Sequence, residues 1–415
     1  MKISEIDTVC FVGAGTMGCF NSLMAAVAGY RAVIYDVSTL ALDNVPASLV
    51  GMSGYLIDQG FFSRDDMPQA IARITTNPVL SDAVAEADLV SESVSERLEI
   101  KRDVHRTLDE LCCGDTLITT NTSSLLVSDI EDVLVHGDRF AALHSHLGSI
   151  LFDIVGGPRT SPKTIDILER YVKSVHGMPL ILKKENPGYV LNAMIGPLLA
   201  TAQLLVIDGL ATHDDVDRAW MLNEGTSIGP FGLMDLFGLN IIFDSWQAPN
   251  PKRAHLQKKV IKFLTPFIEK NTLGVKTGAG FYRYPSPGYS QTDFLTTAVD
   301  LFSIYEALIS ALIESAIFLA HKQIAEPSEI DRAWMASFSL PRGPFGVLDE
   351  IGVDIFLELH ASLVERGLFS AQFTAHVEAF LRPYVTKKLL GVKTGEGFYR
   401  YPEPEYRQDD FVISR

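Results

Sequence analysis

The stretch from residue 7 to residue 18 constrains the fold more than any other part of this chain. An apolar run, Asp7-Thr-Val-Cys-Phe-Val, leads directly into a glycine turn made of Gly13, Ala14, Gly15, Thr16, Met17 and Gly18. A second apolar run, Ala32-Val-Ile-Tyr, ends in the acid Asp36. The order strand, glycine turn, helix, strand and acid is typical of a dinucleotide-binding βαβ unit. The sequence therefore predicts a Rossmann domain built around this turn.

Each glycine of this turn has its own physical task. Gly13 permits the tight turn, Gly15 lets backbone approach a pyrophosphate, and Gly18 lets the helix pack closely on the strand. A helix that begins near Thr16 would present free N–H groups to the phosphates. Asp36 suits the two hydroxyls of a ribose, and no Arg follows it to hold a 2′-phosphate. We therefore expect NAD rather than NADP as cofactor, the alternative being a glycine-rich turn without a ligand.

Length and composition restrict the class of protein. The 415 residues, 47% of them hydrophobic, suffice for two or three domains with large cores. A net charge of -16 argues against nucleic acid or an anionic membrane surface as a partner. We expect no membrane-spanning run, and no signal or transit peptide because the first strand begins almost at once. The four cysteines lack metal-ligand spacing, so we expect reduced thiols, no metal site and a cytoplasmic protein.

The chain changes character at Asn186-Pro-Gly. Residues 1–184 alternate apolar runs with helical patterns, which predicts a doubly wound, mainly parallel sheet with helices on both faces. The strand candidates after residue 80 are Asp88-Leu-Val-Ser, Thr116-Leu-Ile-Thr-Thr, Phe140-Ala-Ala-Leu-His and Pro179-Leu-Ile-Leu. Beyond residue 185 the apolar spacing is helical.

The helical part contains a tandem repeat. The recurring segments are Asp217-Arg-Ala-Trp at Asp331, Gly229-Pro-Phe-Gly at Gly343, and Leu273–Pro285 at Leu390–Pro402 with Ala279 replaced by Glu396. We therefore predict two all-α units in tandem, 185–290 and 291–415, joined near Pro285–Gln291. The second unit would bury the apolar face of the first, as neighbouring repeats do.

Polar side chains follow two neighbouring strands of the predicted sheet. Asn121-Thr-Ser123-Ser-Leu follows one strand, and ligands bind at the carboxyl ends of strands in such sheets. His144 ends the next strand, where a histidine can exchange a proton near neutral pH. A lone histidine at a strand end is more often structural. Two such strand ends beside a dinucleotide turn favour a catalytic site.

Together these motifs resemble the L-3-hydroxyacyl-CoA dehydrogenase family. The resemblance covers essentially the whole chain, and the tandem helical units resemble the dehydrogenase part of the multifunctional fatty-acid oxidation enzymes. The matching elements are the glycine turn, Glu96 and Lys101 in Glu-Ser-Val-Ser-Glu-Arg-Leu-Glu-Ile-Lys, Asn121-Thr-Ser-Ser-Leu, His144 at 21 residues after Ser123, Asn186-Pro-Gly-Tyr-Val-Leu-Asn192, the Gly-Pro-Phe motif and the Lys-Thr-Gly-x-Gly-Phe-Tyr terminus.

The resemblance implies an NAD-dependent oxidoreductase that interconverts 3-hydroxyacyl and 3-ketoacyl thioesters. His144 would remove the hydroxyl proton as a hydride leaves the same carbon for the nicotinamide. Ser123 and Asn192 would hold the substrate oxygens and the histidine. The cofactor-binding residues would be the glycine turn, Asp36, Glu96, Lys101 and Asn121.

The family also suggests how the second helical unit is used. Simpler members form a homodimer through one such unit, so the second copy could replace the partner subunit. The position 114 residues after Asn192 is Glu306, so the site asparagine is not repeated. This supports a structural role for the second copy and leaves a monomer or a homodimer open.

Two departures from the family pattern affect the expected site. The family usually has a Glu twelve residues after the histidine, where this chain has Gly156. A gap of three residues in the intervening loop would place Asp153 at the carboxylate position, the alternative being an N-cap or surface aspartate. His146 in the same loop is expected to be exposed, with a place in the pocket as the other possibility.

The second departure concerns coenzyme A. Family members commonly have a Lys-rich helical excursion after the second strand, and it meets the phosphates of coenzyme A. Between Asp43 and Thr76, however, this chain has no Lys and only Arg64 and Arg73. Acyl-CoA, an acyl group on a carrier protein and a free hydroxy acid therefore stay open as substrates. A homologue that binds the dinucleotide without catalysis is a further alternative.

Overall fold

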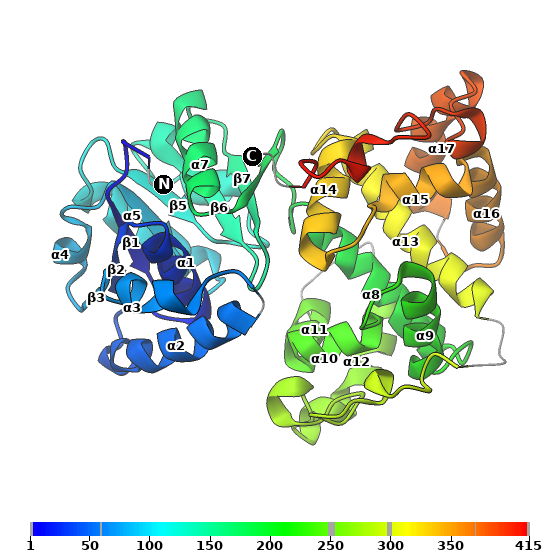
Figure 1. Ribbon diagram of the computed structural model, residues 1–415, viewed down its shortest axis with the longest axis horizontal. Helices are drawn as coiled ribbons and strands as arrows, with labels where there is room; N and C mark the ends of the chain where they lie inside the picture. The colour runs from blue at the N-terminus through cyan, green and yellow to red at the C-terminus, as the bar shows by residue number, and fades with distance from the viewer. Residues whose placement is uncertain (1–2, 59, 248–253, 297–300, 370, 413–415) are drawn as a thin grey trace. The chain divides into compact units, whose positions relative to one another are not determined.

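The computed structural model describes residues 3–58, 60–247, 254–296, 301–369 and 371–412. Its contacts divide the chain into two compact units. The first comprises Met1–Asn192, Lys322–Pro341 and Tyr406–Arg415, and the second comprises Ala193–His321 and Arg342–Glu405. The first unit contains the sheet, and the second is helical (Figure 1).

An eight-stranded sheet forms the centre of the first unit, in the order β3-β2-β1-β4-β5-β6-β7-β8 (Figure 1). The strands are β1 Thr8–Val12, β2 Arg31–Tyr35, β3 Ile74–Asn77, β4 Leu89–Glu92, β5 Leu117–Thr120, β6 Phe140–Ser145, β7 Leu151–Gly156 and β8 Met178–Leu182. Every neighbouring pair is parallel except β6 and β7. The predicted mainly parallel Rossmann domain is thus confirmed. The strand candidates did not include β3, whose Ile-Thr-Thr-Asn carries a single apolar residue at the sheet edge, or β7, which was considered only as the position of Asp153.

Helices pack on both faces of this sheet. They are α1 Thr16–Val27, α2 Thr39–Asp58, α3 Met67–Ile71, α4 Leu80–Val84, α5 Leu98–Leu111, α6 Val127–Glu131 and α7 Pro162–Ser174. Phe20 of α1 and Leu168 of α7 share one apolar core with Phe11 of β1. On the opposite face the His105 ring of α5 packs edge-on against Phe140 of β6, with 4.9 Å between ring centroids. Strand side chains alternate between faces, so these two cores require apolar residues at nearly every strand position.

A segment from far along the chain packs against strands β7 and β8. Helix α14, Pro327–Phe338, contacts β7 and β8 within the first unit. The Lys183 N–H donates to the Ile324 carbonyl at 2.9 Å, and the Lys183 ammonium pairs with Glu326.

The second unit consists of helices in two similar sets, as the predicted tandem requires. They are α8 Leu191–Ile207, α9 His213–Glu224, α10 Pro230–Phe237, α11 Leu239–Gln247, α12 Ala254–Glu269, α13 Phe302–His321, α15 Pro344–Ile351, α16 Val353–Glu365 and α17 Ala371–Thr386. Each set uses a buried aspartate in the same way: Asp235 accepts from the Tyr282 N–H, and Asp349 accepts from the Tyr399 N–H, both at 2.9 Å. The predicted boundaries at residues 184 and 290 stay predictions.

One helix corrects an expectation about membranes. Helix α13 is long and apolar enough to span a bilayer by length and composition, with a mean hydropathy of 1.6, although no such run was expected. In its most apolar window 67% of the residues are buried inside the protein. Its apolar side chains therefore form core contacts, and it is the single helix of this kind within the described residues.

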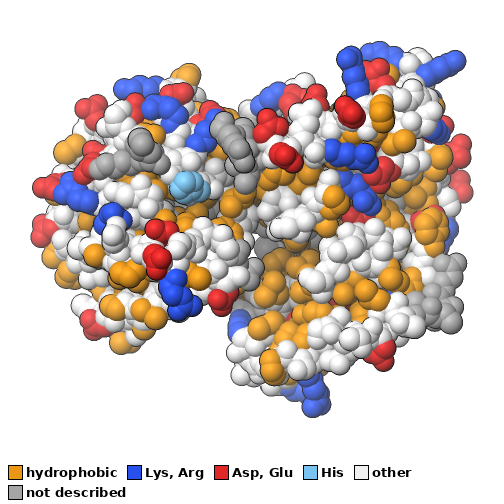
Figure 2. Space-filling model, viewed as in Figure 1, with side chains coloured by type: hydrophobic (Ala, Val, Ile, Leu, Met, Phe, Trp, Pro, Cys, Tyr) orange, Lys and Arg blue, Asp and Glu red, His pale blue; other side chains and the backbone are white. Residues whose placement is uncertain are grey.

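Surface charges of both signs are mixed. Figure 2 shows Lys and Arg side chains interspersed with Asp and Glu over the described residues of the face in view. A protein that neutralises phosphates along a nucleic acid needs its cations gathered on one surface.

Candidate active site

The glycine turn has the shape that a bound pyrophosphate requires. Gly13 has a φ of +116°, and a Cβ there would lie 2.7 Å from the Ser93 carbonyl oxygen. A Cβ on Gly18 would lie 1.8 Å from the Gly13 carbonyl oxygen, so both positions exclude any side chain. At Gly15 nothing lies within 4 Å of the Cβ position, and no side chain caps the N-terminus of α1. The turn thus leaves space and free N–H groups where the phosphates of NAD would bind.

Asp36 is tied to this turn. Its Oδ2 accepts from the Ala14 N–H and its Oδ1 from the Ser38 N–H, both at 2.8 Å. The side chain is partly exposed at the carboxyl end of β2. Each carboxylate oxygen has a second lone pair, so the ribose hydroxyls can still donate to Asp36. The residues of the turn and of β2 therefore fit NAD.

His144 and Asp153 form a hydrogen-bonded pair. They are direct partners in the antiparallel β6–β7 ladder, and His144 Nδ1 lies 2.9 Å from Asp153 Oδ2. Both side chains are buried. Gly156, at the usual family spacing, pairs with Ala141 and offers no carboxylate. The shortened loop thus brings Asp153 opposite the histidine, as the gapped alignment predicted.

The pair is held in the state that a base requires. Burial lowers the pKa of His144, and the hydrogen bond that His144 donates to Asp153 opposes that effect only in part. Burial alone would raise the pKa of Asp153, but hydrogen bonds from His144 and His146 hold it below its usual value. At neutral pH a neutral His144 then donates its Nδ1 proton to an ionised Asp153. Its Nε2 lone pair stays available to accept a proton.

The expectation of an exposed His146 is wrong. Its side chain is 12% exposed, and Nε2 lies 2.9 Å from the same Oδ2 of Asp153 that His144 contacts. The two imidazole rings meet edge to face at 4.4 Å between centroids. His146 follows His144 by two positions, and alternate residues of an extended chain point to the same face. The His-x-His spacing at a strand end was the signal that could have predicted this.

Tyr189 is a site residue that the sequence analysis did not single out. Its ring lies 5.2 Å from that of His144 between centroids. The backbone has a φ of +48°, a left-handed conformation that non-glycine residues adopt at a cost. Its buried hydroxyl has no hydrogen-bond partner within the described residues. The tyrosine of Asn-Pro-Gly-Tyr therefore forms part of the wall beside His144.

The loop after β5 is organised by Glu96. Glu96 Oε1 accepts from the Thr122 hydroxyl at 2.6 Å, and from the N–H groups of Ser123 and Ser124 at 2.9 Å each. The Ser123 carbonyl accepts from the Gly188 N–H at 3.1 Å, which ties this loop to the segment that leads into α8. Glu96 thus shapes the loop that presents Ser123.

The remaining predicted polar residues lie around this loop. Asn121 Oδ1 accepts from the Ser145 N–H at 2.9 Å, which joins the ends of β5 and β6. Asn192 is exposed at the start of α8. In the part of the chain that the structure describes, neither the Ser123 hydroxyl nor the Asn192 side chain makes a hydrogen bond to His144.

Lys101 lies deeper than a direct cofactor contact would require. Its side chain is 1% exposed, and Nζ lies 2.7 Å from Glu92 Oε1 and 3.4 Å from Glu96 Oε2. His105 Nε2 lies 3.0 Å from Glu92 Oε2. Although burial opposes it, His105 and Lys101 lower the pKa of Glu92 to about 2. Lys101 therefore forms an ion pair with Glu96 from inside the protein. Glu92 and His105 belong to the same buried network, and the sequence analysis missed both.

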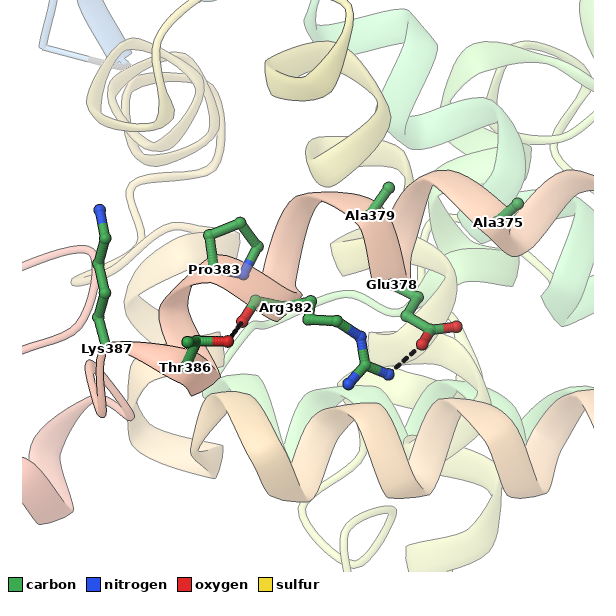
Figure 3. Close-up of a pocket in the computed structure, with 7 residues that line it drawn as sticks. All are labelled: Ala375, Glu378, Ala379, Arg382, Pro383, Thr386 and Lys387. Atoms are coloured by element: carbon green, nitrogen blue, oxygen red, sulfur yellow. Dashed lines mark hydrogen bonds and ion pairs between the residues drawn. The ribbon is translucent and has the colours of Figure 1, made fainter.

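The helical part carries a groove of another character. A groove of about 630 Å³ lies along α17. Figure 3 shows its lining residues as sticks, with the ion pair between Glu378 and Arg382 among them. Its lining residues are Ala375, Glu378, Ala379, Arg382, Pro383, Thr386 and Lys387. It contains none of the predicted site residues and no histidine or cysteine. We therefore place the candidate active site at the β5, β6 and β7 ends.

Comparison with known proteins identifies the family. The profile of the 3-hydroxyacyl-CoA dehydrogenase NAD-binding domain matches residues 8–185. That of the 3-hydroxyacyl-CoA dehydrogenase C-terminal domain matches residues 188–284 and again residues 304–401. The chain belongs to the 3-hydroxyacyl-CoA dehydrogenase family. It is an NAD-dependent oxidoreductase of this family, with the C-terminal domain duplicated.

Individual relatives match to different extents. The chain is 29% identical over 293 residues to a probable 3-hydroxyacyl-CoA dehydrogenase of Caenorhabditis elegans, which covers 68% of this chain and 97% of the relative. The structure of a diketoreductase is 32% identical, with a TM-score of 0.63 over 68% of this chain and 100% of that one. The 3-hydroxybutyryl-CoA dehydrogenase of Escherichia coli K12 shares the fold, with a TM-score of 0.76 at 20% identity, over 92% of this chain and 98% of that one.

Proposed function

We propose that this protein interconverts a 3-hydroxyacyl thioester and the corresponding 3-ketoacyl thioester, with His144 as the general base and acid. The observation that carries the proposal is the buried His144–Asp153 hydrogen bond of 2.9 Å, in a domain whose glycine turn fits NAD. A relative from Clostridioides difficile, 28% identical over 277 residues, is named a 3-hydroxybutyryl-CoA dehydrogenase, which supports a thioester substrate.

In the proposed mechanism His144 accepts the proton of the substrate hydroxyl at Nε2. NAD, when bound, supplies the hydride acceptor. Asp153 orients the imidazole through Nδ1 and stabilises the imidazolium that forms. In the reducing direction the imidazolium returns its proton to the ketone oxygen. Ser123 and Asn192 lie on the segments joined by the Ser123–Gly188 hydrogen bond, from which they would hold the substrate oxygen.

The direct test is the His144→Ala variant, assayed by NADH oxidation with acetoacetyl-CoA. We expect turnover to fall about 10²- to 10⁴-fold, the usual contribution of a general acid or base. NADH binding, followed by fluorescence, should be unchanged because His144 lies outside the glycine turn. The control is His136→Ala, a half-exposed histidine paired with Asp109. Native turnover by His144→Ala would refute the site.

The carrier of the acyl group needs its own experiment. Arg64 is exposed, whereas the Arg73 guanidinium donates to the Ala26 carbonyl at 3.2 Å. This segment thus offers few cations to the phosphates of coenzyme A. We expect similar kcat/KM values for acetoacetyl-CoA and for acetoacetyl-pantetheine, which lacks the nucleotide. A strong preference for the CoA ester would show phosphate contacts elsewhere, and turnover of a free β-dicarbonyl compound alone would favour the diketoreductase-like alternative.

A further inference from the structure

Three side chains at the β6–β7 turn bring metal-ligating atoms together. His144, His146 and Asp153 each offer one such atom, and these atoms all lie within 4.8 Å of one another. Two imidazole nitrogens and one carboxylate oxygen are a ligand set that Zn²⁺ accepts, with water in the remaining position.

The arrangement follows from the strand geometry. His144 and His146 are alternate residues of an extended segment, so their rings share a face. Asp153 is the direct cross-strand partner of His144, and its Oδ2 lies 2.9 Å from a nitrogen of each ring. Small movements of these side chains would therefore bring all three ligands to bonding distance of one ion. The 12% exposure of His146 leaves a way in from solvent.

Within the described residues, the carboxylate of Asp153 has fewer hydrogen-bonding and cationic partners than a buried carboxylate requires. It is fully buried, and its Oδ1 has no hydrogen-bond partner within the described residues. The same residues include no Lys or Arg in an ion pair with Asp153. Burial of a carboxylate oxygen without a partner costs free energy, which a bound cation would offset.

We propose that His144, His146 and Asp153 bind a divalent transition metal ion of the Zn²⁺ type, and that the metal-bound form cannot perform the reaction proposed above. Imidazole ligands favour zinc, copper and nickel over magnesium or calcium. To coordinate the ion, His144 Nδ1 and His146 Nε2 must each give up the proton donated to Asp153, and that proton moves to the other ring nitrogen. On His144 this places a proton on Nε2, which then has no lone pair for the substrate proton.

The binding test uses the full chain after treatment with EDTA and removal of the chelator. Calorimetric titration with ZnCl₂ should show one ion per chain, and Co²⁺ should give the visible absorption of a tetrahedral site. His146→Ala removes one ligand and should weaken Zn²⁺ binding at least tenfold. The matched control, His136→Ala, should bind as the wild type does. Absence of saturable binding by the wild type, or equal binding by His146→Ala, would overturn the proposed site.

Activity measurements separate this inference from the proposed function on which its second half rests. The metal-free enzyme should oxidise NADH with acetoacetyl-CoA, and stoichiometric Zn²⁺ should abolish that activity until EDTA restores it. An active enzyme that binds Zn²⁺ at this site and keeps its rate would overturn the exclusion. A metal-free enzyme inactive on every ketone tested would instead overturn the proposed function and leave the binding result standing.

Discussion

At the scale of single residues, the site depends on where carboxylates and their partners lie. Asp153 replaces the expected glutamate because a shorter loop brings its strand directly opposite His144. A second carboxylate, Glu96, fixes the backbone of the Ser123 loop through hydrogen bonds from three neighbouring residues. In both cases an acid, buried at Asp153 and partly exposed at Glu96, positions a group that would meet the substrate.

Asp36 gives a test of cofactor binding that is independent of catalysis. Asp36→Ala removes the acceptor for the ribose hydroxyls, and two lost hydrogen bonds of about 1–1.5 kcal/mol each predict roughly 30- to 150-fold weaker NADH binding. The preference for NADH over NADPH should shrink as well, because the negative charge no longer faces a 2′-phosphate. Fluorescence titration measures both affinities. Asp43→Ala, at an exposed position of α2, is the control and should bind NADH normally.

Lys101 should be more important for stability than its place in a cofactor motif suggests. Lys101→Met leaves the buried Glu92 carboxylate without its ammonium partner, and the loss of one member of a buried ion pair costs about 3–5 kcal/mol. Urea unfolding should therefore show a lower midpoint. The double variant Lys101→Met with Glu92→Gln should recover part of the loss. An unchanged midpoint for the single variant would mean that the pair contributes nothing to the fold.

At the scale of elements, the helical repeats use buried aspartates to fasten helices to loops. Asp217 at α9 accepts from the N–H groups of Phe231 and Gly232 at 2.7 and 2.9 Å. The Tyr282 hydroxyl donates to the same carboxylate at 3.0 Å. Gly229 lies so close that a Cβ there would come within 2.6 Å of the Asp217 side chain. In the first copy, the Asp-Arg-Ala-Trp and Gly-Pro-Phe-Gly motifs thus encode one structural contact.

Asp217 gives the second unit a dependence on pH. Burial raises the pKa of Asp217 to about 7 from its usual 3.8, although its hydrogen bonds oppose the shift. The folded state therefore holds this proton more tightly than the unfolded chain. The proton on Asp217 therefore adds up to about 4 kcal/mol to the free energy of unfolding. This contribution is fully present below about pH 4 and is lost as the pH rises to 7.

Urea unfolding between pH 5 and pH 8 measures this effect. The free energy of unfolding should fall as the pH rises toward 7 and then level off. Asp217→Asn cannot ionise and should flatten that slope, whereas Glu269→Gln, at an exposed position of α12, should keep it. An identical slope in Asp217→Asn would assign the pH dependence to other groups.

At the scale of the whole molecule, the second copy of the repeat takes part in the first unit. Residues 322–341 belong to the second match of the C-terminal domain profile, yet their contacts place them with the sheet. Helix α14 contacts β7, the strand that carries Asp153. The duplicated domain thus supports the strand behind the proposed base.

A matched pair of tryptophans tests this division of roles. Trp220 of α9 and Trp334 of α14 are repeat equivalents, and each is 2% exposed. Either Trp→Ala change should lower the free energy of unfolding by about 3–5 kcal/mol, because it leaves a cavity in the core. Because Trp334 lies in the first unit, Trp334→Ala should also lower the protection of the sheet amides in hydrogen exchange. Trp220→Ala should lower protection in the second unit, and the reverse pattern would contradict the assignment of α14.

The sequence by itself determined the Rossmann domain, its cofactor turn and the helical tandem, and it named Asp153 as the candidate partner of His144. These features depend on local rules: glycines where a Cβ would collide, strand-length apolar runs, and residues at strand ends. The predicted roles of Ser123, Asn192 and the cofactor residues stay predictions.

Only the tertiary structure decided which distant residues share a site or an edge. It turned His146 inward onto Asp153, placed Tyr189 beside His144, buried Lys101 with Glu92 and His105, and brought α14 to the sheet. The contacts of Tyr189 and α14 join residues far apart in the sequence. Those of His146 with Asp153 and of Lys101 with Glu92 span seven and nine residues, and even the first of these depends on the register of β6 against β7. A one-residue change of register would turn Asp153 to the other face of the sheet, so the site exists only once the strands have paired.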